Sequence, residues 1–163
     1  MSQYTSTPTT APQSTATSTA VQRAALIIGI TFLLVGIAGF IPGITQNFDE
    51  IEFAGHESGA ELLGIFQVSV LHNLVHMAFG VIGLIAARRA KSSSAFLIGG
   101  GVVYLVLLGY GLLVDQDHDA NFVPFNDADN WLHLGLGVAM IGLGVILGRS
   151  AMPDDELTHV PSR

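Results

Sequence analysis

The chain has 163 residues, of which half are hydrophobic and only 12% are charged. Soluble domains carry about 25% charged residues, so this composition favours an integral membrane protein. The formal net charge of −7 argues against nucleic-acid binding, and the lack of cysteine excludes disulfides, thiolate metal sites and cysteine nucleophiles.

The N-terminal segment 1–22 is uncharged and rich in Ser, Thr, Pro and Ala. Such a segment cannot bury enough apolar surface to offset the entropy that it loses on ordering. We therefore expect a disordered cytoplasmic tail over 1–22, a membrane domain over 23–149, and a second cytoplasmic tail over 150–163.

The predicted membrane domain contains four runs of residues without charge. They cover residues 24–48, 62–87, 92–114 and 130–148. A helix needs roughly 17–25 residues to cross the hydrocarbon of a bilayer, so each run can supply one span. The sequence predicts helices near 24–44, 64–87, 93–114 and 129–148, and hence an all-α bundle of four transmembrane helices.

The charges flanking these runs predict the orientation of the helices. With four crossings, all six basic residues fall on one side, and they are Arg23, Arg88, Arg89, Lys91, Arg149 and Arg163. Basic residues collect on the cytoplasmic side of a membrane. Most of the acidic residues lie in the two outer connections, 49–61 and 115–129. We expect a multi-pass protein of the bacterial cell membrane with both termini in the cytoplasm.

An Asn-x-x-His pattern occurs in both the second and the fourth run. The second run contains His72-Asn73-Leu74-Val75-His76-Met77-Ala78-Phe79-Gly80-Val81, and the fourth contains Asp129-Asn130-Trp131-Leu132-His133-Leu134-Gly135-Leu136-Gly137-Val138. Asn, His, Gly and Val coincide at the same spacing. Both helices run from outside to inside, so the pattern predicts two similar helical hairpins in a parallel repeat.

These motifs also carry a resemblance. Residues 62–76, the string Asn-Phe-Val-Pro at 121–124, and residues 129–137 are similar to a bacterial family of small four-helix membrane proteins. That family is catalogued as a domain of unknown function. The resemblance covers about residues 23–149 and implies the fold, but it implies no activity.

The conspicuous polar residues of the predicted spans fall on two helix faces. They are His72, Asn73 and His76 in the second run, with Asn130 and His133 in the fourth. In the inner half of each span, glycines continue the same face. Histidine and asparagine in membrane helices often form structural hydrogen bonds, and ionisable groups there also mark ligand sites. These five residues are therefore the candidate site.

Several ligands suit such a set of side chains. His72, His76 and His133 could bind a transition metal, with a coordination position left open. His76 and His133 could bind a haem from facing helices, and a quinone or lipid headgroup could accept hydrogen bonds from His and Asn.

A structural or accessory role in a membrane complex is the favoured interpretation, with binding of haem, metal or quinone as the alternative. We expect contact with the lipid bilayer and with a membrane-protein partner or a second copy of the chain. The sequence shows no nucleophile–base pair, phosphate loop or carboxylate dyad, so an enzyme is not favoured.

Overall fold

The computed structural model describes residues 18–114 and 126–151. Most of the predicted N-terminal tail, the C-terminal tail from residue 152, and residues 115–125 of the second outer connection lie outside this part of the chain. The Asn-Phe-Val-Pro string at 121–124 also lies outside it.

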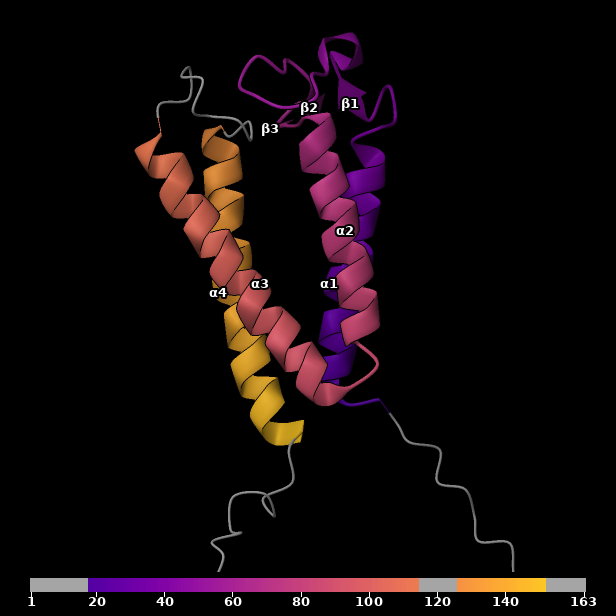
Figure 1. Cartoon of the computed structure of the whole chain (residues 1–163), viewed down its shortest axis with the longest axis vertical. Coiled ribbons are helices and arrows are strands. Elements are labelled where there is room, and N and C mark those ends of the chain that lie inside the picture. Colours follow the sequence, from indigo (N-terminus) through magenta and orange to yellow (C-terminus); the bar gives the residue numbers. More distant parts are fainter. Residues whose placement is uncertain (1–17, 115–125, 152–163) are drawn as a thin grey trace, which may run out of the picture.

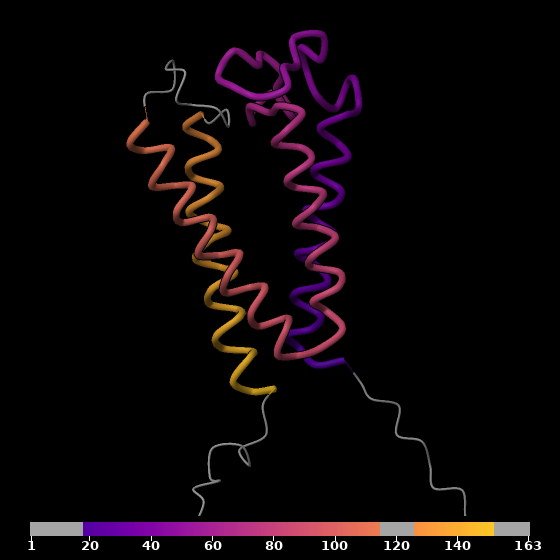
Figure 2. The backbone as a smooth tube through the Cα atoms, viewed as in Figure 1, coloured from indigo at the N-terminus to yellow at the C-terminus, as the bar shows by residue number. Residues whose placement is uncertain are grey.

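Four helices, arranged as two hairpins, dominate the described residues. The first hairpin pairs α1 (Ala20–Ala38) with α2 (Val70–Ala86), and the second pairs α3 (Ala90–Leu113) with α4 (Asp127–Ala151). Packing is close within each hairpin and sparser between the two. The hairpins lie side by side and diverge toward the end at which α1 finishes and α2 begins (Figures 1 and 2).

The helices are apolar on their outer faces, as expected for contact with lipid. Within the described part, α1, α3 and α4 are long and apolar enough to cross a membrane. Helix α2 has 17 residues, the lower limit of roughly 17–25 for a span. Large hydrophobic side chains such as Ile27, Val106 and Ile146 are more than 60% exposed. The fold is therefore a mostly helical bundle with the surface of a membrane protein.

Three helix boundaries differ from the predicted ones by roughly one to one and a half turns. The helix predicted over 24–44 begins at Ala20 and ends at Ala38, and the helix predicted over 64–87 begins at Val70. Local hydrogen bonds explain both starts: Thr19 forms a capping box with Gln22, and the Ser69 hydroxyl accepts from the backbone N–H of His72. Uncharged sequence continues past both helices, so the charge pattern alone could not locate these ends.

A small cap, residues 39–69, connects α1 to α2. It contains β1 (Thr45–Gln46), a 3-10 turn at Phe48–Glu50, β2 (Glu61–Leu62) and β3 (Phe66–Gln67). The strands form an antiparallel sheet in the order β1-β2-β3, with Leu62 opposite both Thr45 and Phe66. Apolar periodicity does not predict this sheet, because each strand has only two residues.

Hydrogen bonds tie the cap to the start of α2. The carbonyls of Glu52 and Phe53 accept from the first backbone N–H groups of α2, at Val70 and Leu71. The buried Ser58 hydroxyl donates to the carbonyl of Val68 at 2.6 Å. Since the first turn of a helix has no internal partners for its N–H groups, these bonds stabilise α2 at the point where its polar residues begin.

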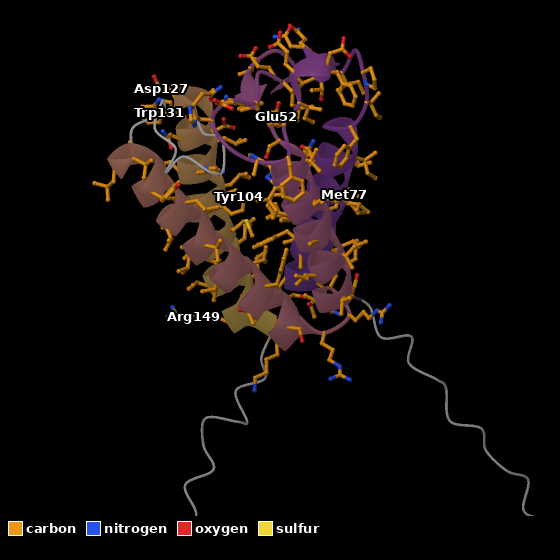
Figure 3. All side chains as sticks on the ribbon, turned by 45° about the horizontal axis from the view of Figure 1, so that its top comes forward. Glu52, Met77, Tyr104, Asp127, Trp131 and Arg149 are labelled. Atoms are coloured by element: carbon orange, nitrogen blue, oxygen red, sulfur yellow. The ribbon has the colours of Figure 1, made fainter. Side chains whose placement is uncertain are left out.

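Basic and acidic residues occupy opposite ends of the bundle. Arg23, Arg88, Arg89, Lys91 and Arg149 lie at the end away from the cap. Figure 3 shows Arg149 at this end, with Glu52 and Asp127 at the other. This segregation matches the charge asymmetry that the sequence predicts, and Arg163 lies outside the described residues.

The first hairpin is held together by contacts at its two ends and its centre. Gln22 Nε2 donates to the carbonyl of Ala87 at 3.0 Å near the basic end. A Cβ atom on Gly80 would lie 2.9 Å from the carbonyl oxygen of Gly29, so the two backbones touch at mid-helix. Near the cap, a Cβ on Gly39 would overlap the side chain of Asn73.

The second hairpin makes contacts of the same kinds. Ser94 Oγ donates to the carbonyl of Gly144 at 2.9 Å near the basic end. At the centre, a Cβ on Gly101 would lie 2.7 Å from the carbonyl oxygen of Gly137. Near the outer end, Asn130 Nδ2 donates to the carbonyl of Gly111 at 3.4 Å. Glycine is required at these crossings because the backbones approach too closely for a side chain.

Two glycines of α3 provide a matched test of this packing. A Cβ on Gly101 meets backbone atoms of α4, whereas Gly99 is exposed and has nothing within 4 Å of that position. We expect Gly101→Ala to lower the free energy of unfolding by about 1–3 kcal/mol through overpacking. Gly99→Ala should leave it unchanged or raise it by up to about 1 kcal/mol, because alanine favours helix. Unfolding by a denaturing detergent would measure both, and equal stability of the two variants would contradict the packing described.

Candidate functional site

The two histidines of α2 lie one turn apart and contact each other. His72 Nε2 and His76 Nε2 are 3.1 Å apart, and the ring centroids are separated by 4.6 Å. His72 is 8% exposed and His76 is half-buried. A distance of 3.1 Å between ring nitrogens is that of a hydrogen bond, in which one ring donates and the other accepts.

Four aromatic rings from all four helices join the two hairpins. Phe32 of α1 stacks on Tyr104 of α3, with centroids 5.5 Å apart and an interplanar angle of 3°. Each of these rings also meets a histidine edge-on: Phe32 meets His76 at 5.6 Å, and Tyr104 meets His133 of α4 at 5.0 Å. Tyr104 lies between the hairpins (Figure 3). The cluster fixes His76 and His133 on opposite sides of one interface.

A cavity of about 200 Å³ lies beside this cluster, toward the cap. Its polar lining comes from α2, α3 and α4, and consists of His72, Asn73, His76, Tyr104, Asp129 and His133. Its apolar lining comes from α1, the cap and α4, and consists of Val35, Leu62, Leu63, Phe66, Val68 and Leu132. Leu63 and Leu132 are 60% and 37% exposed, so the lining reaches the outer surface of the bundle.

Several polar atoms of the residues that line the cavity are buried and have no hydrogen-bond partner within residues 18–114 and 126–151. They are Nδ1 of His72, Nδ1 of His76 and Nδ2 of Asn73. Leaving a buried donor or acceptor unsatisfied costs about 1–3 kcal/mol per group. These atoms are enclosed by protein atoms, so an added group could bond them only if the neighbouring side chains shift.

The structure brings four of the five predicted site residues to this cavity. His72, Asn73, His76 and His133 line it, and His76 and His133 share it from different hairpins. Asn130 does not line it. Its amide bonds the carbonyl of Gly111, and it borders a separate groove of about 360 Å³ beside Trp131.

Two polar residues of the cavity are absent from the sequence prediction. Asp129 is 2% exposed, and its Oδ2 accepts from the backbone N–H of Asn126 at 3.1 Å. Asp129 directly precedes Asn130, just as His72 directly precedes Asn73 in the other copy of the Asn-x-x-His pattern. This correspondence could have identified Asp129 as a candidate site residue. Tyr104 is 4% exposed and sits in an otherwise apolar run, where one tyrosine resembles any interfacial aromatic residue.

The arrangement limits which ligands can bind. Among residues 18–114 and 126–151, no group of three or more His, Asp or Glu side chains is placed to hold a metal ion. His72 and His76 approach each other through their Nε2 atoms. The cavity can offer hydrogen-bond donors and acceptors to a small molecule, with aromatic rings on one side.

Comparison with known proteins gives a family but no activity. A search of curated proteins found no match, and neither did a search of solved structures. A family model described as Domain of unknown function (DUF4383) matches residues 22–146, which include α2, α3, most of α1 and α4, and the residues that line the cavity. The chain therefore belongs to this family, the domain of unknown function DUF4383, in agreement with the resemblance carried by its His and Asn motifs.

Proposed function

We propose that this protein is a four-span membrane protein that binds a single-ring compound of the quinone class between its two hairpins. The observation that carries the proposal is the 200 Å³ cavity, which is lined by histidine, asparagine and aspartate side chains from both hairpins. The site would lie in the outer half of the membrane, with the ring between the hairpins and any apolar tail in the lipid.

Charge segregation and helix length support four crossings with the cap outside. A basic end faces the cytoplasm in most membrane proteins, and the cap carries acids instead. Helix α2, at 17 residues, spans roughly 26 Å, close to the thickness of the hydrocarbon. The basic ends of α1 and α4 would then face the cytoplasm, which agrees with the expected cytoplasmic termini.

Corresponding contacts support a duplicated hairpin. Three contacts of the α1–α2 hairpin have counterparts in the α3–α4 hairpin. The Gln22 hydrogen bond corresponds to the Ser94 hydrogen bond, and each hairpin has a glycine crossing at mid-helix. In each hairpin an asparagine also packs on a glycine, which is Gly39 in the first and Gly111 in the second. The helix starts also match. Ser69 and Asn126 each accept from the backbone N–H three residues later. Phe32 and Tyr104 would be equivalent residues meeting near a pseudo-twofold axis.

Cavity volume favours one ring over larger groups. A cavity of about 150 Å³ is enough to bind benzene, and drug-sized ligands use about 300–1,000 Å³. At about 200 Å³, the cavity suits one substituted six-membered ring and is too small for the four pyrrole rings of a haem. This size favours a quinone over a haem among the ligands considered from the sequence.

The polar groups suit the oxygens of a quinone or its reduced quinol. Carbonyl oxygens accept hydrogen bonds from imidazole or amide N–H groups, and phenolic hydroxyls donate to imidazole nitrogen or carboxylate. The Tyr104 ring adds an aromatic wall. An accessory role through glycine-rich faces has weaker support, because glycines such as Gly36, Gly80 and Gly101 contact other helices of the same chain.

Cysteine labelling tests the topology, since the native chain has no cysteine. Glu57 in the cap and Ser92 at the start of α3 are both exposed. In intact cells, a membrane-impermeant maleimide should label Glu57→Cys, and it should label Ser92→Cys only after the membrane is permeabilised. The reverse pattern would invert the topology, and the cysteine-free parent controls for background.

A binding measurement tests the ligand class. Trimethyl-1,4-benzoquinone, which has no tail, should bind the purified protein saturably with one site per chain, as measured by equilibrium dialysis. His76→Leu should weaken binding about tenfold, because losing one hydrogen bond in a buried site costs about 1–3 kcal/mol.

The control for this experiment is His56→Leu, the same substitution in the cap at a residue that does not line the cavity. It should bind the probe as the wild type does. Absence of saturable binding by folded wild-type protein, or equal affinity in both variants, would refute the proposed function.

A further inference from the structure

We infer that the ligand enters this cavity sideways from the outer leaflet of the membrane, and that it carries a hydrocarbon tail which leaves between the cap and α4. This inference rests on the proposed function, because the ring that it concerns is the quinone-class ring of that site. It goes further by naming the opening of the cavity and the class of ligand, which is a tailed membrane quinone rather than a water-soluble one.

The cavity lining meets the surface through two leucines. Leu63 of the cap is 60% exposed and Leu132 of α4 is 37% exposed. The polar lining lies deeper, since Tyr104, Asp129 and His133 are each less than 5% exposed. A molecule that reaches the polar groups from outside therefore passes apolar side chains first.

The position of Leu132 along α4 places this opening at the outer edge of the hydrocarbon. Helix α4 begins at Asp127, so Leu132 lies roughly 7.5 Å from its acidic start. The neighbouring Trp131 is 73% exposed, and exposed indole rings concentrate at the level of the lipid headgroups. In the topology proposed above, the opening therefore faces lipid, and a ligand can enter it without leaving the membrane.

The cap side of the opening is held against α4 by a hydrogen bond. Leu63 lies in the turn between β2 and β3, where Leu63 and Gly64 have φ angles of 57° and 67°. Asn126 Nδ2 donates to the carbonyl of Ile65 at 2.8 Å, which fixes this turn to the start of α4. A positive φ is unfavourable for a bulky side chain, and asparagine or glycine would suit it better. An exposed leucine at this strained position fits a role for its apolar side chain.

These features select a ligand with an apolar substituent on its ring. A hydrocarbon tail that passes between the two leucines stays in apolar surroundings from the ring out to the lipid. A polar or charged substituent at the same ring position would meet leucine side chains, which offer it no hydrogen bond. The opening therefore favours a quinone whose tail remains in the membrane while its ring occupies the cavity.

Equilibrium dialysis with two matched probes tests this inference. One probe is trimethyl-1,4-benzoquinone, and the other is the same ring with a ten-carbon chain at its one free position. The tailed probe should bind saturably, with one site per chain, and the tail-less ring should displace it. The quantity to compare between variants is the affinity for the tailed probe divided by that for the tail-less probe. Partitioning of the tail into detergent affects every variant equally, so it cancels in this comparison.

Replacing either leucine should reduce this affinity ratio. In Leu63→Asn it should fall about fivefold, because the tail loses an apolar neighbour while the ring keeps its contacts. Asparagine tolerates a positive φ, so this variant should fold. The control is Ile65→Asn, because Ile65 lies in the same turn, is 52% exposed and does not line the cavity.

A second pair of variants repeats the test on α4. Leu132 and Leu143 are 37% and 38% exposed, and of these two only Leu132 lines the cavity. The affinity ratio should fall in Leu132→Ala and stay at the wild-type value in Leu143→Ala.

The outcomes separate the opening from the binding site itself. If the tail-less ring binds but the tailed probe does not, the opening is overturned and the binding function stands. The same conclusion follows if Leu63→Asn and Leu132→Ala keep the wild-type ratio, or if each control lowers it as much as its partner variant does. If neither probe binds to folded wild-type protein, both the inferred opening and the proposed function fail.

Discussion

The close approach of helix backbones within each hairpin is the constraint on which the rest of this structure depends. Glycine at the crossings of α1 with α2 and of α3 with α4 removes the side chains that would hold the helices apart. Lipid offers little hydrophobic drive for helix association, so this contact has to come from van der Waals packing and interhelical hydrogen bonds. Each hairpin therefore becomes a thin unit with little interior of its own.

The bulky and polar side chains are consequently placed between the hairpins. Phe32, Phe79 and Tyr104 meet there, and they contact one another edge-on or stacked. Rings of this size cannot pack as closely as glycines, so the hairpins separate where the rings end. The cavity lies at that separation, covered by Leu62, Phe66 and Val68 of the cap.

The polar lining is costly to maintain, and this cost is the strongest indication of function. Ser58 and Ser93 show that this chain satisfies buried hydroxyls when their role is structural, since each bonds a backbone carbonyl. Nδ1 of His72, Nδ1 of His76 and Nδ2 of Asn73 differ, because no group in the described part of the chain bonds them. Three unsatisfied groups at about 1–3 kcal/mol each amount to a large share of the stability of a small domain.

The sequence by itself determined the membrane character, the four helical segments and the segregation of charge, because these follow from runs of apolar residues and their flanking charges. It also identified His72, Asn73, His76 and His133, since polar residues are conspicuous in apolar helices. The cap sheet was not predictable, because strands of two residues carry no periodic signal. Asn130 was assigned to the site because it shares a helix face with His133, but its position in the fold turns its amide to Gly111 instead.

Only the tertiary structure decided how these residues meet. Helical periodicity places a residue on a face, but it does not say which helix that face contacts or at what depth. The pairing of helices into two hairpins brought Tyr104 and Asp129 beside His72, although they lie 32 and 57 residues from it in the sequence. The volume between the hairpins likewise depends on how Phe32 and Tyr104 pack against each other. Because these two rings come from different helices, the pattern along one helix does not predict their contact.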